Sequence, residues 1–196
     1  MTDTKAETRT ETRTETRTEI WIEAGFAEIA RSGVEGVRVE VLAKNLGVTK
    51  GGFYRRFRDR AALLSGMLAE WSTARIAAIE QQASLDGETA RDRLQSLIRL
   101  YSERMNTEAI AIELAIRQWA RTDEAAAEAV ASVDAARLKN VAQLYRATGL
   151  EAEDADARAF LFYCFVFGQS LLFLDRGMRK RSALIAKSAE TLLGDH

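Results

Sequence analysis

Apolar residues recur along most of the chain at the three- and four-residue spacing that is typical of amphipathic helices. In the first sixty residues this spacing, with glycines that end the runs, predicts three short helices over residues 19–31, 39–46 and 50–58. Farther along, longer runs rich in Ala and Leu predict helices over residues 60–83, 88–106, 108–121, 123–147, 153–176 and 179–193. The predicted fold class is therefore all-α.

The start of the chain lacks this pattern. The tetrapeptide Glu-Thr-Arg-Thr appears three times, beginning at Glu7, Glu11 and Glu15, and it has no apolar residue to bury. In a helix it would stack like charges four residues apart, which is mildly destabilising. We interpret residues 1–18 as a flexible arm. Its four basic and five acidic side chains over residues 1–19 favour a solvated tail, and an Arg-bearing arm that reaches DNA is the alternative.

Composition narrows the classes of function. An apolar fraction of 47% suffices for a sizeable core, and a net charge of −1 excludes a chain-wide polybasic binder of nucleic acid or membranes. The single Cys164 cannot form an internal disulfide, and no apolar run follows Met1, so we expect a cytoplasmic protein without a membrane anchor. The single histidine, His196, argues against catalytic triads and His-based metal sites. We assign no catalytic residue, no metal and no cofactor.

Residues 39–57 place small and apolar residues where a helix-turn-helix requires them. Ala43 is small where two helices cross, and Gly47 permits a left-handed turn between them. Val48 is expected to reach from that turn into the core, and Thr49 is a candidate N-cap of the next helix.

The helix after Thr49 carries a local basic surface. Residues 20–60 hold eight basic and five acidic side chains, whereas the remainder of the chain after residue 60 is net acidic. Gly51 and Gly52 leave the first turn of this helix without bulk, so that its backbone can approach a duplex. The side chains expected to point into the major groove are those of Lys50, Tyr54, Arg55 and Arg56. A solvated basic helix would explain the charges but not the placement of the glycines.

These motifs resemble the DNA-binding domain of the tetracycline-repressor-like (TetR-type) regulators. The resemblance covers roughly residues 19–64 and rests on Trp21-Ile22-Glu23-Ala24-Gly25, Gly33, Leu42-Ala43, Gly47-Val48-Thr49-Lys50-Gly51, Phe53-Tyr54, Phe57 and Leu63-Leu64. It implies base-edge contacts from Lys50, Gly51, Gly52 and Arg55. It implies phosphate contacts from Arg38, Thr49, Tyr54, Arg56 and Arg60. The sequence departs from the family where Thr or Ser usually caps the second helix, because Arg38-Val39 stand there, and Arg56 replaces a common His.

The resemblance also implies a division of the chain. Residues 19–62 would form the helix-turn-helix domain, and residues 63–196 a helical ligand-binding and dimerisation body. Pockets combine apolar walls with a few polar groups, and the candidate effector-binding residues are Met67, Trp71, Tyr101, Met105, Glu113, Arg117, Trp119, Tyr163 and Phe167. Ordinary core packing is the alternative for each. Glu113 and Arg117, four residues apart, fit a surface ion pair, or, on a buried face, polar groups that orient a ligand.

The segment from residue 159 to 174 is rich in aromatic residues and too interrupted for a confident membrane span. A helix that is apolar on all sides must be covered on all sides, for example by its own body and by a second subunit. With the helix over residues 179–193 it predicts a four-helix dimer interface that includes Phe165, Phe173, Leu184 and Ile185.

The leading hypothesis is a homodimeric transcription regulator, most simply a repressor, that binds double-stranded operator DNA and is released by an unidentified small-molecule effector. A helical-bundle enzyme and a protein-binding adaptor are the alternatives. Against a helical-bundle enzyme, the sequence has no Glu-x-x-His pair, no nucleotide-binding Gly-rich loop and no Cys-His pairing. An adaptor would not need Gly51, Gly52 and the clustered arginines.

Overall fold

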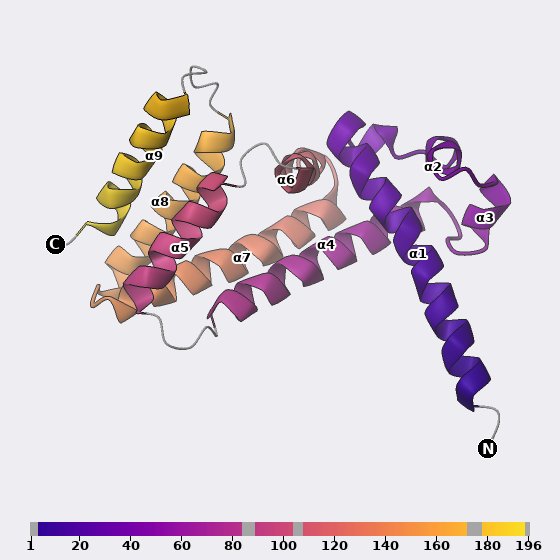
Figure 1. Cartoon of the computed structure of the whole chain (residues 1–196), viewed down its shortest axis with the longest axis horizontal. Helices are drawn as coiled ribbons and strands as arrows, with labels where there is room; N and C mark the ends of the chain where they lie inside the picture. The colour runs from indigo at the N-terminus through magenta and orange to yellow at the C-terminus, as the bar shows by residue number, and fades with distance from the viewer. Residues whose placement is uncertain (1–3, 84–88, 104–107, 172–177, 195–196) are drawn as a thin grey trace. The chain divides into compact units, whose positions relative to one another are not determined.

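The computed structural model describes the backbone of residues 4–83, 89–103, 108–171 and 178–194, and within these ranges its regular elements are helices (Figure 1). Side chains at positions 4–17, 82–83, 102–103, 170 and 178–182 lie outside the description. The elements are α1 Thr4–Ser32, the 3₁₀ turn η1 Val34–Gly36, α2 Val39–Asn45, α3 Lys50–Tyr54, α4 Arg60–Ala83, α5 Ala90–Glu103, α6 Glu108–Trp119, α7 Glu124–Ala147, α8 Ala152–Leu171 and α9 Met178–Leu193. The predicted all-α class is confirmed.

The chain divides into two compact units. The first comprises residues 1–72 and 111–130, and the second comprises residues 73–110 and 131–196. The first unit thus contains α1, η1, α2, α3, the start of α4, most of α6 and the start of α7. The functional division at residues 62 and 63, inside α4, stays a prediction.

The N-terminal helix is longer than predicted. It begins at Thr4 rather than at residue 19 and ends at Ser32, before Gly33, whose φ of 71° is left-handed. Neither Gly nor Pro occurs between Thr4 and Ala24, so nothing in the sequence stops the helix that the apolar positions from Trp21 onward anchor. The mobility of residues 1–18 stays a prediction.

The third helix is shorter than predicted. It ends at Tyr54 instead of at residue 58. Two features end it: the Phe57 side chain is buried, and Asp59 caps α4 by accepting a hydrogen bond from the Ala62 amide at 2.8 Å. That bond and a weaker one from Arg58 hold the pKa of Asp59 below its usual value. The residues between Tyr54 and Asp59 therefore turn instead of continuing the helix.

Local capping sets the start of α5 and both ends of α7. Thr89 and Asp92 form a reciprocal capping box at the start of α5, with Asp92 N to Thr89 Oγ1 at 3.1 Å and Thr89 N to Asp92 Oδ2 at 3.2 Å. Asp123 accepts the Ala126 amide at 2.9 Å and begins α7. Gly149, at φ 100°, ends that helix. No helix in the described ranges is long and apolar enough to cross a membrane.

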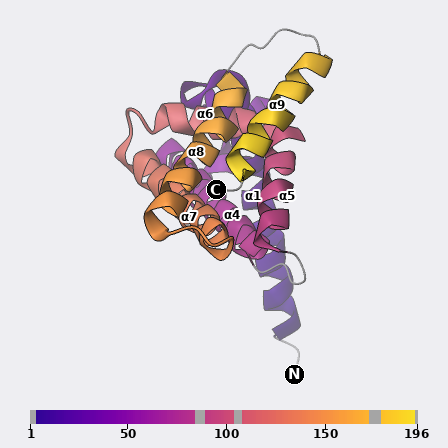
Figure 2. The same cartoon turned by 90° about the vertical axis from the view of Figure 1, so that its left-hand side faces the viewer.

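The second unit packs α5, α8 and α9 side by side around the C-terminal part of α7 (Figures 1 and 2). Leu94, Val141, Tyr145 and Phe162 are among its fully buried side chains. Burial of these apolar groups is the main force that holds the unit together.

Candidate functional site

The turn between α2 and α3 has the geometry that the sequence predicts. Gly47 lies at φ 65°, and the chain reverses there as Val48 N donates to Ala43 O at 2.9 Å. Ala43 and Leu42 are buried. The prediction that Val48 reaches into the core is wrong, because its side chain is 49% exposed. It lies on the surface beside Ile20, because the rings of Trp21 and Phe53 already fill the core.

Three rings fix the orientation of α3. Phe53 is fully buried, and its ring lies 5.2 Å from that of Trp21, edge to face, and 5.4 Å from that of Phe57, stacked. Because Phe53 anchors one side of this short helix to α1, the opposite side must face outward. Tyr54, at 58% exposure, lies on that outer side.

Lys50 begins α3 and is exposed, as predicted. Its Nζ donates to Glu40 Oε1 of α2 at 2.7 Å, and this hydrogen bond is the main reason that the pKa of Glu40 lies below its usual value. Sequence analysis missed Glu40, since the two residues lie ten positions apart and only the turn brings them together. Both side chains are more than half exposed, so the pair leaves Lys50 accessible to an outside acceptor.

Among the described residues, nothing requires glycine at positions 51 and 52. Neither residue has a left-handed φ. A Cβ at Gly51 would meet, among described atoms, Thr49 Oγ1 at 3.7 Å, and one at Gly52 would meet the Trp21 ring at 3.9 Å, both ordinary contacts. Two glycines in so short a helix are unfavourable, by roughly 0.5–1 kcal/mol each relative to Ala. Their presence therefore points to an external surface that approaches the backbone closely.

Neither α2 nor α3 has a side-chain cap at its N-terminus. Thr49 is the N-cap residue of α3, as predicted, but its hydroxyl makes no capping hydrogen bond. Arg38 is the N-cap residue of α2 and likewise provides no side-chain cap. Both side chains are exposed, in the position where a phosphate could accept their hydrogen bonds.

Arg55 and Arg56 lie in the turn after α3, not on the helix as predicted. With Ile20, Trp21, Leu46, Val48 and Gly52 they line a shallow cleft of about 420 Å³. Arg55 is exposed and Arg56 is half-buried. The cleft therefore joins an apolar floor to a cationic rim.

Arg60 has a different position from the other predicted phosphate contacts. Its Nε donates to Val37 O at 2.6 Å and its Nη2 donates to Val34 O, so the guanidinium holds the η1 segment against the start of α4. The side chain is only 37% exposed. This arrangement favours a structural role.

We expect Arg60→Met to destabilise the protein by about 1–3 kcal/mol, because two partly buried backbone carbonyls lose charge-assisted hydrogen bonds. Urea unfolding followed by circular dichroism measures this. Arg58→Met is the matched control, since Arg58 is 87% exposed and pairs only with its neighbour Asp59 among described residues. An equal loss in both variants, or none in Arg60→Met, would contradict the structural role.

The predicted effector-binding residues separate into the two units. In the first unit, Met67 is buried against Gly25, where an added Cβ would lie 2.5 Å from Met67 Sδ, so Met67 serves core packing. Trp71 and Trp119 are buried. The indole Nε1 of Trp71 has no hydrogen-bond partner in the part of the chain that the structure describes.

Glu113 and Arg117 form an ion pair with 3.0 Å between Oε1 and Nε. The interpretation of a surface pair is wrong, because Glu113 is only 3% exposed. Ile116 and Trp119 share the buried face of α6 with it. This face of α6 is therefore buried, and the role of the pair in orienting a ligand stays a prediction.

In the second unit, three predicted residues come together. Tyr163 stacks on Phe167 at 6.2 Å and lies 6.4 Å from Tyr101, edge to face. The guanidinium of Arg137 lies 5.6 Å from the centroid of the Phe167 ring. Burial, aided by Tyr101, raises the pKa of Tyr163, so its hydroxyl stays neutral. Met105, the remaining candidate, lies outside the described residues.

Gln169 is a buried polar residue that sequence analysis did not select. Its side chain is 4% exposed, and neither Oε1 nor Nε2 has a hydrogen-bond partner among described residues. Buried amides are nearly always satisfied. The sequence signal for this residue was an amide in the middle of a Phe-rich segment. In the structure, the side chain of Gln169 marks a place where a water or a ligand can bind.

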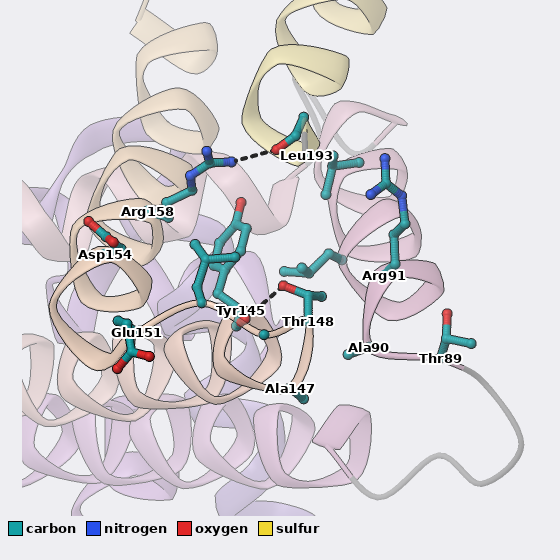
Figure 3. Close-up of a pocket in the computed structure, with 14 residues that line it drawn as sticks. Thr89, Ala90, Arg91, Tyr145, Ala147, Thr148, Glu151, Asp154, Arg158 and Leu193 are labelled. Atoms are coloured by element: carbon teal, nitrogen blue, oxygen red, sulfur yellow. Dashed lines mark hydrogen bonds between the residues drawn. The ribbon is translucent and has the colours of Figure 1, made fainter. Parts of the chain in front are cut away.

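A cavity of about 550 Å³ lies at one end of the second unit, lined by α5, α8 and α9 and by the turn after α7. None of the predicted effector-binding residues lines it. Figure 3 shows Arg158 reaching the end of α9, where its Nη1 donates to Leu192 O and Gly194 O at 3.0 and 3.1 Å. Tyr145 also donates to Leu192 O, at 3.2 Å, and burial raises its pKa to about 12. These polar groups serve the fold by holding α9.

The predicted dimer residues differ in their burial within the single chain, and their place in an interface stays a prediction. Phe165 is half-buried against the core of its own unit, and Ile185 is 9% exposed, so both face inward in the single chain. Leu184 is 54% exposed and fits the prediction, whereas Phe173 lies outside the described residues. The outward side of α8 carries other apolar residues, with Phe160, Leu161 and Leu171 each more than half exposed.

Comparison with known proteins agrees with this geometry. Residues 22–67 match the family described as bacterial regulatory proteins, tetR family. Among curated protein sequences, none matches the chain. Among the solved structures that share its fold, three illustrate the similarity. A transcriptional regulator of the TetR family from Agrobacterium tumefaciens has a TM-score of 0.74 and 13% identity, covering 91% of this chain and 98% of that one.

The other two are a TetR-family regulator from Mesorhizobium loti and a transcriptional regulator from Saccharomonospora viridis in complex with choline. Both have a TM-score of 0.70, with 20% and 18% identity, and they cover 92% and 91% of this chain and 95% and 93% of their own. Residues 22–67, which hold the helix-turn-helix, therefore match the tetR family of bacterial regulatory proteins, and the chain as a whole has the fold of these three solved structures.

Proposed function

We propose that this regulator is a homodimeric repressor that leaves its operator when a small molecule binds the helical body. The observation that carries the DNA-binding part is the outer face of α3, where Lys50 is exposed and two glycines that the fold does not need lie beside it. A duplex lying against the bare backbone would place Lys50 and Arg55 near base edges. In this proposal the phosphate contacts come from Thr49, Tyr54, Arg56 and Arg38, which lie on or beside the same face, whereas Arg60 supports the domain from inside.

The outward face of α8 supports the homodimer. Large exposed apolar side chains are unfavourable on a monomer and mark contact surfaces, and Phe160, Leu161 and Leu171 cluster on this one helix. A two-fold dimer presents two recognition helices to successive major grooves, about 34 Å apart.

Two buried polar groups without partners support the effector. Gln169 in the second unit and Trp71 Nε1 in the first each lack a hydrogen bond among described residues. A ligand that satisfies such a group gains affinity and specificity. The Saccharomonospora regulator was solved with choline, but here the Arg137 guanidinium already occupies the face of Phe167. We therefore favour an uncharged or anionic effector with a hydrogen-bonding group.

Effector release follows from a population shift. A ligand that binds better to a body conformation in which the recognition helices no longer match successive grooves draws the dimer toward that conformation. Operator affinity falls by the ratio of the effector affinities for the two states. Repression and release then need no chemical reaction.

The test is operator binding by the double variant Lys50→Ala/Arg55→Ala. We expect it to lose about 2–5 kcal/mol of binding free energy on the DNA upstream of the chain's own gene, since each base contact contributes roughly 1–3 kcal/mol. Fluorescence anisotropy measures the affinity, and circular dichroism shows that the helices persist. Lys139→Ala is the matched control, because Lys139 is an exposed lysine of α7 in the second unit. Sequence-specific affinity retained by the double variant would refute the assignment of α3 as the recognition helix.

Deleting residues 2–14 is expected to change operator affinity by less than about tenfold, or about 1.4 kcal/mol. This segment holds Lys5, Arg9 and Arg13 against Asp3, Glu7 and Glu11, so it adds no net charge to neutralise phosphates. Binding measured over a range of salt concentrations should give nearly the same slope as the full chain. A much larger loss, with a slope reduced by about two or more, would instead identify the Glu-Thr-Arg-Thr repeat as a DNA-binding arm.

A further inference from the structure

The outward face of α8 consists of small and large residues in a definite order. Along the exposed side the order is Ala157, Phe160 with Leu161, Cys164, Gly168 and Leu171, at the three- and four-residue spacing of one helical stripe. Phe160 is 60% exposed and Leu171 is 63% exposed. The opposite side of the same helix, through Ala159, Phe162 and Val166, is buried in the unit's own core. We call this outward stripe the α8 face.

We infer that two copies of the α8 face pack against each other in antiparallel fashion, with the crossing point at Cys164. The inference rests on the homodimer proposed above and goes beyond it by fixing the register of the contact. In a two-fold arrangement of antiparallel helices, a residue that precedes the crossing point faces the residue that follows it by the same number of positions. Phe160 then faces Gly168 of the partner subunit, and Ala157 faces Leu171 of the partner subunit.

This register matches large residues to small ones in both pairs, as close packing of two helices requires. A crossing point one turn earlier, at Leu161, does not. It would place Asp154 against Gly168 of the partner subunit and Glu151 against Leu171 of the partner subunit. Both carboxylates are exposed in the single chain and would lose water on contact with apolar surface.

Gly168 adds an independent observation. It lies in the interior of α8 with an ordinary helical φ, and a Cβ added there would meet no atom of the described residues within 4 Å. Glycine in a helix interior is unfavourable compared with alanine. The part of the single chain that the structure describes therefore gives no reason for glycine here, whereas the ring of Phe160 of the partner subunit would need the space.

The amount of apolar surface also fits a second copy. Phe160, Leu161 and Leu171 together expose on the order of 300 Å² of apolar surface, a large share of the roughly 800 Å² that one partner contributes to a standard interface. Leu184 of the adjacent α9 is 54% exposed and extends the surface. A partner of unrelated sequence would not require the α8 face to be complementary to a second, reversed copy of itself. The order of large and small residues along the face therefore favours a second copy of this chain.

The crossing point makes the register testable with the natural protein. Cys164 is the single cysteine of the chain and is exposed. Packed helix axes lie about 8–10 Å apart, so facing residues at a crossing point come within reach of a short bismaleimide. We expect the full-length protein to form a covalent dimer on a denaturing gel, and Cys164→Ser to form none while remaining a dimer by sedimentation.

The matched control moves the thiol along the same face. In Cys164→Ser/Ala157→Cys the two thiols would lie about 21 Å apart along the helix axes, since each residue of a helix advances 1.5 Å, and the short reagent should not join them. Cross-linking at position 157 but not at 164 would overturn the register. A sedimenting dimer that does not cross-link at Cys164 would overturn it too, while leaving the homodimer intact. A monomer would refute both.

A size exchange provides a second test. Gly168→Leu should weaken dimerisation at least about tenfold, because the new side chain meets Phe160 of the partner subunit. Adding Phe160→Ala in the Gly168→Leu background should restore the dimerisation constant to within about threefold of the wild type, since the two positions share one space. Failure of the second substitution to restore dimerisation would contradict the Phe160–Gly168 contact. Restoration would support it independently of the thiol chemistry.

Discussion

Gly51→Leu is expected to abolish specific operator binding while leaving the protein as stable as the wild type or more so. Within the fold, a Cβ at this position meets, among described atoms, Thr49 Oγ1 at 3.7 Å, so a larger side chain has room. Replacing glycine by a good helix former in α3 should add roughly 0.5–1 kcal/mol of stability. On the operator, the same side chain would occupy the space between the backbone and the duplex.

We expect an affinity loss of about a hundredfold or more, equivalent to about 2.7 kcal/mol. Gly51→Ala should give a smaller loss in the same direction. Thermal unfolding and fluorescence anisotropy on one preparation measure the two effects together. Ala69→Leu, at an exposed position of α4, is the matched control and should bind normally. If Gly51→Leu bound the operator as well as Ala69→Leu, α3 would not approach DNA through its first turn.

Much of this fold was predictable because short-range chemistry determines it. Glycines with left-handed φ mark the ends of α1, α2 and α7, and Asp or Thr caps begin α4, α5 and α7. These signals lie within four residues of the boundary that they set. The long start of α1 was missed for the same reason, because a helix that continues has no local stop signal.

The errors concern which way a side chain faces. Val48 follows a turn, and its exposure depends on whether Trp21 and Phe53, distant in sequence, already fill the space beneath it. The aromatic segment of α8 has apolar residues on all sides, so its pattern did not distinguish Phe165, which faces the core, from Phe160, which faces outward. Burial at such positions depends on tertiary contacts.

The candidate site shows the same limit. The basic character of α3 was evident from Lys50 and its neighbours, but the partner of Lys50 was not, because Glu40 approaches it only across the turn. Arg60 resembles a phosphate ligand in sequence, yet it donates to the carbonyls of Val34 and Val37. A cationic residue near a DNA-binding helix can therefore serve the fold, and only its hydrogen bonds distinguish the two roles.

Leu161→Glu is expected to convert the proposed dimer into folded monomers. Leu161 is 54% exposed in the single chain, so a carboxylate there is tolerated by the monomer, whereas the dimer would bury two such charges near its two-fold axis. Several kcal/mol of desolvation should raise the dimer dissociation constant by about a thousandfold or more.

Sedimentation equilibrium measures the dissociation constant, and circular dichroism shows whether the helices persist. Gln143→Glu, an exposed position of α7 that gains the same charge, is the matched control and should remain dimeric. Operator affinity of Leu161→Glu should fall by about 10²–10⁴, because a monomer loses the gain from binding two linked half-sites. A stable Leu161→Glu dimer would place the interface away from the outward side of α8, and normal operator affinity in a monomeric variant would show that one recognition helix is sufficient.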